Sequence, residues 1–376
     1  MKACAYESFA LAPGLVQLNH ASYGLTSRRV MRAADEARKR IEADPTVRLG
    51  AELFELLRDR TSRVAEAFGL EPSQTTFCAN ATSGAAAVIS SLPLSAGDTV
   101  VVLDTEYSSI IRAWEVAAAR VSSKVVFVPV TLPFHSAEHL LTALDAAVPG
   151  AVAYLQMSLV SSSAAVRLPV QAVAAWVRQR GGRLILDAAH GPGHVPVCPS
   201  EWGAAAMFGT LHKWLPSLRA VGFLWLAEEF VDRVQPAEVS LTWDSRDLTE
   251  RFSWPGTFDP APRLTIDTAL EQWTDWQTRG LLAESEALAD IGTRLLTDCG
   301  ARPTADAAHL PPRMRAFLLD GVTVPEIKNA VRAANIRVWA GPGPRGECLL
   351  RFATHIYNDE PDFESLARTI KEVLTR

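Results

Sequence analysis

The sequence lacks several features that would assign a protein to a class at once. It contains no run of about 18 apolar residues, so we expect no transmembrane helix. Its lysines and arginines form no block, and its net charge is -5, which argues against nucleic acid or an anionic membrane as a partner. We find no internal repeat and no low-complexity segment. These absences favour a soluble globular protein that acts on a small molecule.

Cysteine is scarce, with five residues at positions 4, 78, 198, 299 and 348. An odd number without zinc-finger spacing favours a reducing compartment over a disulfide framework. His190, His194 and Cys198 lie close in sequence, but Gly191, Pro192 and Gly193 interrupt any helical face between them, so we expect no metal. Residues 1–14 include no apolar run as long as that of a signal peptide. We therefore expect a cytoplasmic protein.

What the chain does contain is a long alternation of short apolar runs and helical patterns. A length of 376 residues suits one large domain and one smaller domain. Helical patterns occupy residues 108–121, 137–147 and 170–180. The apolar runs are residues 75–78, 99–103, 124–130, 151–156, 183–186, 204–208 and 220–226. This alternation predicts an α/β fold with a large, mostly parallel seven-stranded sheet and helices on both faces.

The two ends of the chain have a different pattern. Amphipathic helices are predicted through residues 30–41 and 51–68, before the first run. After residue 226, a long helical stretch covers residues 264–296, with a break at Gly280. Further strands are predicted near residues 314–319, 337–339 and 349–353, and helices near 324–334 and 362–374. We predict a large domain at residues 15–262, and a smaller α+β domain at residues 1–14 and 263–376 joined by the long helix.

Polar residues follow three of the predicted strands, at the sheet edge where ligands bind in open parallel sheets. Asp187 ends one run, and Lys213 follows the next, between His212 and Trp214. Burial there would lower the lysine pKa and activate the amine as a nucleophile. Residues 79–84 place small hydroxyl side chains before an alanine-rich helix, which is typical of an anion site. An amine, a carboxylate and a phosphate cradle are what pyridoxal phosphate (PLP) requires.

Each of these features alone also has a simpler interpretation. Asp187 could cap a helix, Lys213 could be a surface lysine beside a core indole, and residues 80–84 could be an ordinary turn. Arg351 could belong to an interface ion pair. The combination makes the PLP interpretation the stronger one.

The combination of Asp187-x-x-His190, His212-Lys213-Trp214 and Arg351 resembles the class V aminotransferases of PLP fold type I. This family includes the cysteine desulfurases and PLP enzymes of lincosamide and small-thiol pathways. The chain is most similar to its isopenicillin N epimerase-like branch, from residue 18 to residue 358.

The resemblance implies roles for individual residues. Lys213 would hold PLP as a Schiff base and move protons at the substrate, Asp187 would pair with the pyridine nitrogen, and His190 would contact the phenolic oxygen. Tyr107 would stack on the ring. The phosphate would be held by Ala81, Thr82, Thr210 and His212, and by Thr257 of a neighbouring subunit, which implies a homodimer with active sites at the interface. The substrate contacts would be Arg351, which binds the α-carboxylate, with Ser162, Asn19 and His20.

Two departures from the family pattern bear on the reaction. Cysteine desulfurases carry a catalytic cysteine on a loop before the carboxylate-binding arginine, whereas residues 340–346 contain none and Cys348 lies at the start of the strand of Arg351. Desulfuration is therefore not expected. The family often has His, Asn and Gly where this chain has Leu159, Ser162 and Ala165. The small side chains of Ser162, Ser163 and Ala165 would leave room for a bulky substrate side group.

We therefore expect a PLP-dependent enzyme of secondary metabolism, such as antibiotic biosynthesis, that acts on an α-amino acid or an amino-acid conjugate. A lyase-type reaction is favoured, either β-elimination with C–S cleavage or decarboxylation coupled to oxidative deamination. Epimerisation and transamination stay open as alternatives. A binding protein with an inactive PLP fold is the non-enzymatic alternative, and the joint presence of Lys213, Asp187 and Arg351 argues against it.

Overall fold

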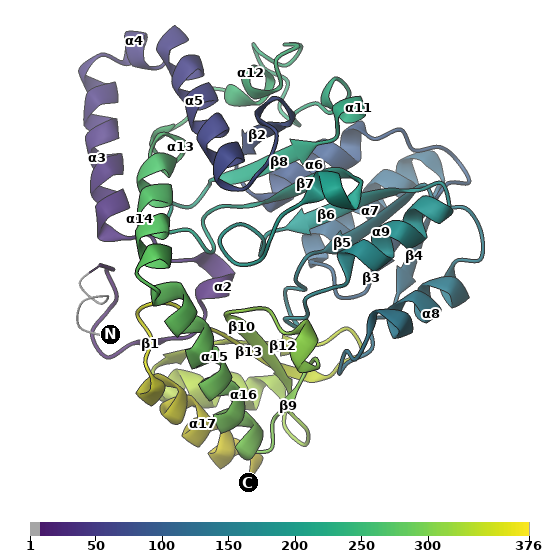
Figure 1. Cartoon of the computed structure of the whole chain (residues 1–376), viewed down its shortest axis with the longest axis vertical. Coiled ribbons are helices and arrows are strands. Elements are labelled where there is room, and N and C mark those ends of the chain that lie inside the picture. Colours follow the sequence, from purple (N-terminus) through teal and green to yellow (C-terminus); the bar gives the residue numbers. More distant parts are fainter. Residues whose placement is uncertain (1–7, 376) are drawn as a thin grey trace.

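The computed structural model describes residues 8–375, so residues 1–7 of the predicted small domain, including Cys4, lie outside the described residues. Two sheet-containing parts are visible (Figure 1), linked by helices α14 (Ile266–Thr278) and α15 (Leu281–Asp298). The predicted long helix is divided at Gly280, whose φ of 75° is left-handed and suits glycine. Within residues 8–375, no helix has both the length and the apolarity needed to cross a bilayer.

The larger part is built on a seven-stranded sheet, which confirms the predicted fold class. Its strand order is β2-β8-β7-β6-β5-β3-β4. Every strand runs parallel to the others except β8, which is antiparallel to both of its neighbours. The seven strands are β2 (Thr75–Cys78), β3 (Thr99–Leu103), β4 (Lys124–Val128), β5 (Tyr154–Ser158), β6 (Arg183–Ala188), β7 (Ala204–Thr210) and β8 (Gly222–Leu226).

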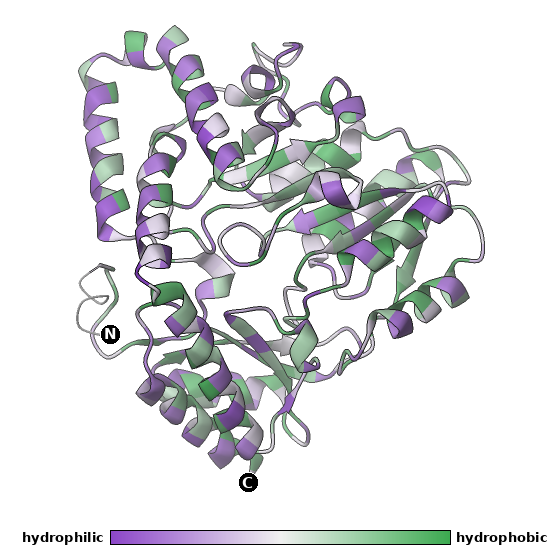
Figure 2. Ribbon diagram, in the orientation of Figure 1, coloured by the Kyte–Doolittle hydropathy of each residue, from purple (hydrophilic) through white to green (hydrophobic). Residues whose placement is uncertain are grey.

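Helices cover both faces of this sheet because the strands are apolar on both sides. In β3, Val101 and Leu103 join one core cluster, while Val100 and Val102 join the other. The first cluster packs against α5 (Ala51–Ala67), α8 (Ala137–Ala147) and α9 (Val170–Gln179). The second packs against α6 (Ala81–Ser91) and α7 (Ser108–Val121). The strands of the large sheet are mostly hydrophobic, whereas the outer helices carry hydrophilic residues (Figure 2).

The smaller part contains an antiparallel sheet of order β12-β13-β10-β9, backed by helices. Its core cluster joins residues of α15 with those of the other helices. The elements are β9 (Arg302–Pro303), β10 (Met314–Leu318), α16 (Val324–Ala333), β12 (Trp339–Pro342), β13 (Cys348–Ala353) and α17 (Glu360–Leu374). This arrangement agrees with the α+β character predicted for this region.

The N-terminal segment returns to this smaller part. Strand β1 (Val16–Gln17) pairs in parallel with β11 (Ile336–Arg337), and Leu18 is buried in the core cluster of the small sheet. The short helix α2 (His20–Tyr23) follows directly. The domain limits at residues 15–262 and 263–376 stay a prediction, and the β1–β11 pairing places residues 16–18 against the small sheet.

Candidate active site

One cavity lies at the carboxyl ends of the parallel strands, between the two parts of the molecule. It encloses about 950 Å³ including its open mouth, which is the size of a pocket that holds a cofactor and a substrate. Ten predicted site residues line it, from six separate segments of the chain: Ala81, Thr82, Tyr107, Ser162, Asp187, His190, Thr210, His212, Lys213 and Arg351. The fold therefore brings together residues that lie up to 270 positions apart, since Arg351 and Ala81 share this wall.

Lys213 follows β7 and projects into this cavity. Its Nζ lies 3.4 Å from Nε2 of His190. Burial lowers the pKa of Lys213 to about 8; Asp187 opposes this effect, and the positive charge of Arg351 adds to it. A substantial fraction of the amine is therefore neutral near physiological pH, which a nucleophilic lysine requires.

Asp187 lies near the end of β6 and is buried. Its Oδ1 accepts a hydrogen bond from the backbone N–H of Ala189 at 2.7 Å. Among the described residues no donor hydrogen-bonds to its second oxygen, and Asp187 lines the cavity. Burial raises the pKa of Asp187, whereas Lys213 lowers it. A cationic ring nitrogen in the cavity would keep this carboxylate ionised.

Glu106 is a buried carboxyl group beside Asp187 that the sequence did not single out. Its Oε1 accepts from the backbone N–H of Ser158 at 2.6 Å, and its Oε2 accepts from Nε2 of Gln156 at 3.4 Å. Burial and the nearby charge of Asp187 raise the pKa of Glu106 to about 8. Glu106 is thus mostly neutral at pH 7 and adds little negative charge beside Asp187.

The first turn of α6 forms the predicted phosphate cradle. Asn80 caps this helix, and its side chain accepts from the N–H of Ser83 at 3.0 Å. The N–H groups of Ala81 and Thr82 are therefore left for an anion. Gly222 on β8 permits this geometry, because a Cβ there would lie 2.8 Å from Cα of Asn80.

Two other predicted phosphate ligands have hydrogen bonds of their own. Thr210 donates its hydroxyl to the carbonyl of Ala189 at 3.0 Å, and His212 donates Nδ1–H to the carbonyl of Val221 at 3.0 Å. Both side chains line the cavity. The hydroxyl oxygen of Thr210 can still accept a hydrogen bond from a ligand in the cavity, and Nε2 of His212 also stays available to it.

Arg351 on β13 lines the same cavity as the lysine. Its guanidinium donates to the carbonyl of Ser162, to Oγ of Ser22 at 2.8 Å and to Oδ1 of Asn19 at 3.2 Å. Its Cζ lies 5.4 Å from the ring centroid of Trp339. Among residues 8–375, no carboxylate forms an ion pair with this buried cation, and burial lowers its pKa to about 10. A substrate carboxylate would supply the missing negative charge.

Three predicted residues do not line the cavity. Asn19 does not line the cavity, but its Oδ1 accepts a hydrogen bond from Arg351, which does. His20 is 1% exposed and lies behind the wall, where its Nδ1 meets the hydroxyl of Tyr357 at 2.9 Å. Because burial prevents direct access, we do not include His20 in the proposed substrate site. Thr257 is exposed, away from the cavity of its own chain.

Of the small side chains predicted to make room for the substrate, only one lines the cavity. Ser162 lines the cavity, but Ser163 does not, and Ala165 is fully buried in a separate core cluster with a left-handed φ of 49°. Sequence reasoning also missed Ser22, Tyr23 and Trp339, which complete the wall. Trp339 carried no signal because it lies on a short hairpin of the other part of the molecule.

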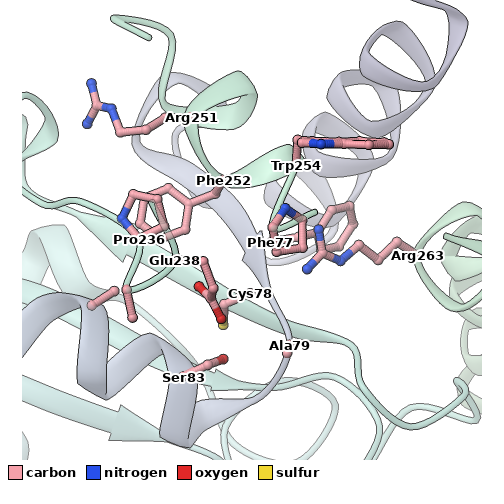
Figure 3. A pocket seen from close by; sticks show the side chains of 13 residues that line it. Phe77, Cys78, Ala79, Ser83, Pro236, Glu238, Arg251, Phe252, Trp254 and Arg263 are labelled. Atoms are coloured by element: carbon pink, nitrogen blue, oxygen red, sulfur yellow. The ribbon is translucent and has the colours of Figure 1, made fainter. Parts of the chain in front are cut away.

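A second, smaller cavity borders the segment that contains Thr257 (Figure 3). It lies between β2 and α12 (Leu248–Ser253), and Trp254 and Arg263 are among the residues that line it. Arg263 is buried, and its Cζ lies 5.0 Å from the ring centroid of Phe258. Aromatic and guanidinium packing on both sides of Thr257 thus anchors its exposed loop to the large sheet.

The donor set on the main cavity fits PLP. Lys213 supplies an amine of lowered pKa, Asp187 supplies a carboxylate oxygen for the ring nitrogen, and α6 supplies free amide groups for the phosphate. These groups lie on one wall, as the chemistry of this cofactor requires.

Comparison with known proteins agrees with this geometry. The family model described as aminotransferase class V matches residues 18–366. The chain is 27% identical to isopenicillin N epimerase of Streptomyces clavuligerus, over 95% of this chain and 94% of that protein. It is 28% identical to the enzyme of the same name from Amycolatopsis lactamdurans, over 98% of each.

Solved structures show the same fold. The cystine C–S lyase C-DES, in complex with its product cysteine persulfide, superimposes with a TM-score of 0.83 at 19% identity, covering 96% of this chain and 98% of that one. A variant of C-DES with glycine covalently linked to PLP gives the same TM-score and identity, covering 97% and 98%.

Proposed function

Because the chain belongs to the aminotransferase class V family, and is a PLP-dependent enzyme, we propose that it is a lyase that cleaves an S-substituted cysteine or a related amino-acid conjugate. The observation that carries this proposal is the single amine of the cavity. Lys213 is the one lysine on the wall formed by the described residues, and both histidines of that wall have a ring nitrogen engaged in a hydrogen bond. Elimination needs only one group to take and return a proton, whereas epimerisation by two bases needs a partner on the opposite side.

Each residue of the proposed site has a separate role in the reaction. PLP, when bound, supplies an electron sink that stabilises negative charge on the substrate carbon next to the amino group. Lys213 takes the proton from that carbon and returns it to the leaving sulfur. Asp187 holds its negative charge against the ring nitrogen, and His190 presents a ring N–H from the wall.

Arg351 sets the orientation of the substrate. Its planar guanidinium binds the α-carboxylate through paired hydrogen bonds. Ser22, Asn19 and the carbonyl of Ser162 hold the guanidinium in place. The side group of the substrate is then directed toward the mouth, which Tyr23 and Trp339 border. No desulfurase cysteine lies on the wall among the described residues, which supports elimination over persulfide transfer.

We further propose that the enzyme works as a homodimer. Thr257 is exposed on its own chain, and the nearby side chains of Val239 and Leu241 are 82% and 86% exposed. Large exposed apolar side chains beside an anchored loop are typical of an interface. By resemblance to the family, Thr257 would complete the phosphate site of the partner.

Epimerisation is the second candidate, and one observation favours it. The two isopenicillin N epimerases match at 27% and 28% identity over nearly the full length of both chains. The wall also carries Tyr23 and Tyr107, whose hydroxyl groups are the alternative proton donors.

One experiment separates these reactions. The purified enzyme is incubated in D₂O with S-alkyl cysteines and with peptide-linked amino acids, and pyruvate, ammonia, CO₂ and H₂O₂ are assayed together with deuterium at Cα. A lyase releases pyruvate and ammonia. Deuterium incorporation with inversion and without breakdown identifies an epimerase, and CO₂ with H₂O₂ identifies oxidative decarboxylation. Protein that binds PLP without turning over any of these compounds would favour the binding-protein alternative.

The assignment of the reacting lysine is tested with Lys213→Ala. This variant is expected to lose the visible absorption band of the lysine-bound cofactor, its bleaching by borohydride, and all activity. Retention of the band would overturn the proposed function.

A further inference from the structure

We propose that Trp214 and His194 are positioning residues that fix His190 as one neutral tautomer, so that His190 presents an N–H group, and never a proton acceptor, to Lys213. The inference deepens the proposed function and rests on it only in taking Lys213 as the reacting amine. It concerns side chains that lie behind the cavity wall.

The indole of Trp214 determines which nitrogen of His190 lacks a proton. Nε1 of Trp214 lies 3.2 Å from Nδ1 of His190. An indole N–H only donates, so Nδ1 must accept and carries no hydrogen. The proton of the neutral imidazole is then on Nε2.

Nε2 of His190 is the atom that faces the reacting amine. It lies 3.4 Å from Nζ of Lys213. Protonation of both ring nitrogens would place two N–H groups against each other at Trp214. Burial, together with the positive charges of Lys213 and Arg351 and the neighbouring His194, lowers the pKa of His190 well below its usual value. The imidazolium form is thus excluded by both geometry and charge.

Trp214 cannot turn away, because two imidazole rings and a guanidinium pack around it. It is fully buried and stacks on His194 with ring centroids 3.8 Å apart and an interplanar angle of 17°. Cζ of Arg313 lies 5.0 Å from the centroid of the same indole. The ring centroid of His20 lies 5.7 Å from that of the indole.

His194 is held in a single tautomer too. Its Nε2 accepts from the backbone N–H of Arg313 at 3.1 Å, so its proton is on Nδ1. That Nδ1–H donates to the carbonyl of His190 at 3.2 Å. The side chain of His190 is therefore fixed by Trp214 and its backbone carbonyl by His194, which leaves Nε2 of His190 facing the lysine.

As a consequence, His190 and Lys213 have different roles at the reacting carbon. His190 can donate a hydrogen bond to the neutral amine of Lys213, or to an oxygen of the cofactor beside it, but its own lone pair is engaged by Trp214 and cannot take a proton. Proton removal then falls to Lys213.

The test reads the tautomer directly. Protein with ¹⁵N-labelled histidine is studied by two-bond ¹H–¹⁵N correlation, in the apo form and with PLP. His190 of the parent should show an unprotonated Nδ1 and a protonated Nε2 in both. Trp214→Phe should give a mixture of tautomers, and so should replacement of Trp214 by 3-benzothienylalanine, which keeps the ring shape but lacks the N–H. The matched control is Trp225→Phe, because Trp225 is a buried tryptophan of the large sheet whose Nε1 has no partner.

Two results would overturn the inference: a proton on Nδ1 of His190 in the parent, or an unchanged single tautomer in the benzothienylalanine protein. The benzothienylalanine protein separates loss of the hydrogen bond from loss of packing if Trp214→Phe does not fold. Because the apo spectra need no turnover, a failed lyase assay or a retained cofactor band in Lys213→Ala would refute the proposed function while leaving the tautomer result standing.

Discussion

At the scale of single residues, the cavity has more positive than negative charge. Lys213 and Arg351 face one ionised carboxylate, Asp187, since Glu106 is mostly neutral at pH 7. A buried cation without a counter-ion is costly. The guanidinium of Arg351, which has no ion-pair partner among the described residues, is thus suited to a substrate carboxylate. The phosphate of the cofactor is instead suited to the amide groups at the start of α6.

Replacement of Arg351 by alanine should separate substrate binding from cofactor binding. Removing one partner of a buried charge pair costs roughly 2–5 kcal/mol, so the affinity for amino acids should fall by about 30-fold to several thousand-fold. Cofactor affinity should hardly change. Spectral titration of the holoenzyme with amino-acid ligands measures both. The control is Arg302→Ala, an exposed arginine of the same sheet that pairs with Asp320. Unchanged amino-acid affinity in Arg351→Ala would remove the carboxylate role.

The rate at which apoprotein captures PLP should rise with pH. Only the neutral amine of Lys213 attacks the cofactor aldehyde, and its pKa is about 8, so the rate should reach half of its plateau near that pH. Arg351→Ala removes a positive charge that lowers this pKa and should move the midpoint to higher pH. Asp187→Asn should move it to lower pH. Stopped-flow absorbance follows the capture. Midpoints that coincide in all three proteins would contradict the assigned electrostatics.

At the scale of elements, the site depends on where neighbouring strands end. Glu106 follows β3, Ser158 ends β5, and Asp187 lies near the end of β6, the next strand in the sheet. The hydrogen bond from Ser158 to Glu106 joins two of these ends at 2.6 Å. Strand register, rather than any loop, therefore sets the position of Asp187.

The contribution of Glu106 to stability should depend on pH in a defined direction. Its pKa is raised from 4.5 to about 8 in the folded chain, so the native state holds a proton that the unfolded chain releases. That contribution is fully present below pH 4.5 and is lost as pH rises through 8. The stability of the parent relative to Glu106→Gln should thus decrease between pH 5 and pH 9. Urea unfolding of both proteins across this range measures it, and a constant difference would show that Glu106 is ionised in the native state.

Because β8 closely approaches the phosphate cradle, we predict that position 222 tolerates only glycine. In Gly222→Ala, the new Cβ would lie 2.7 Å from the carbonyl of Gly209 and 2.8 Å from Cα of Asn80. Displacement of Asn80 should weaken PLP binding, and overpacking should cost about 1–3 kcal/mol of stability. Gly150→Ala is the control, because nothing lies within 4 Å of its Cβ. PLP affinities and melting temperatures report the difference, and equal values in the two variants would refute it.

The elements themselves were mostly predictable from the sequence. All seven apolar runs are strands, and α7 and α8 have the predicted bounds. The reversed direction of β8 was not, because a strand buried on both faces has the same apolar pattern in either direction. Strand β1 was missed because its two residues are too short for any periodicity.

At the scale of the whole molecule, the parts of the site come from distant regions of the chain. Motif residues such as Asp187 and Lys213 were predictable because unusual chemistry follows a strong strand signal. Trp339 and Glu106 were not, since only tertiary packing brings a hairpin tryptophan to the cavity wall and a loop carboxyl group close to Asp187. The role of Trp214 required the distance to His190, which no spacing in the sequence encodes.

Subunit mixing should show whether the dimer completes each site. Each proposed site combines Lys213 of one chain with Thr257 of the other. In a dimer of one Lys213→Ala chain and one Thr257→Ala chain, one site therefore carries both substitutions and the other site carries neither. Dissociation and reassociation of the two variants together should restore activity, whereas either variant alone should not recover. Sedimentation velocity should show a dimer at micromolar concentration. A monomer that binds PLP and turns over substrate would contradict the shared site.

The contact between Arg351 and the first residues of the chain also gives the site an order of assembly. Every cofactor residue from Ala81 to Lys213 is translated long before Arg351, and Asn19 and Ser22 meet the guanidinium only after that strand exists. On the ribosome, the amine proposed to react with the cofactor is therefore made first, and the arginine proposed to bind the substrate carboxylate is made last. A chain cut short before residue 351 would keep the reactive lysine and lose the guanidinium that discriminates among amino acids.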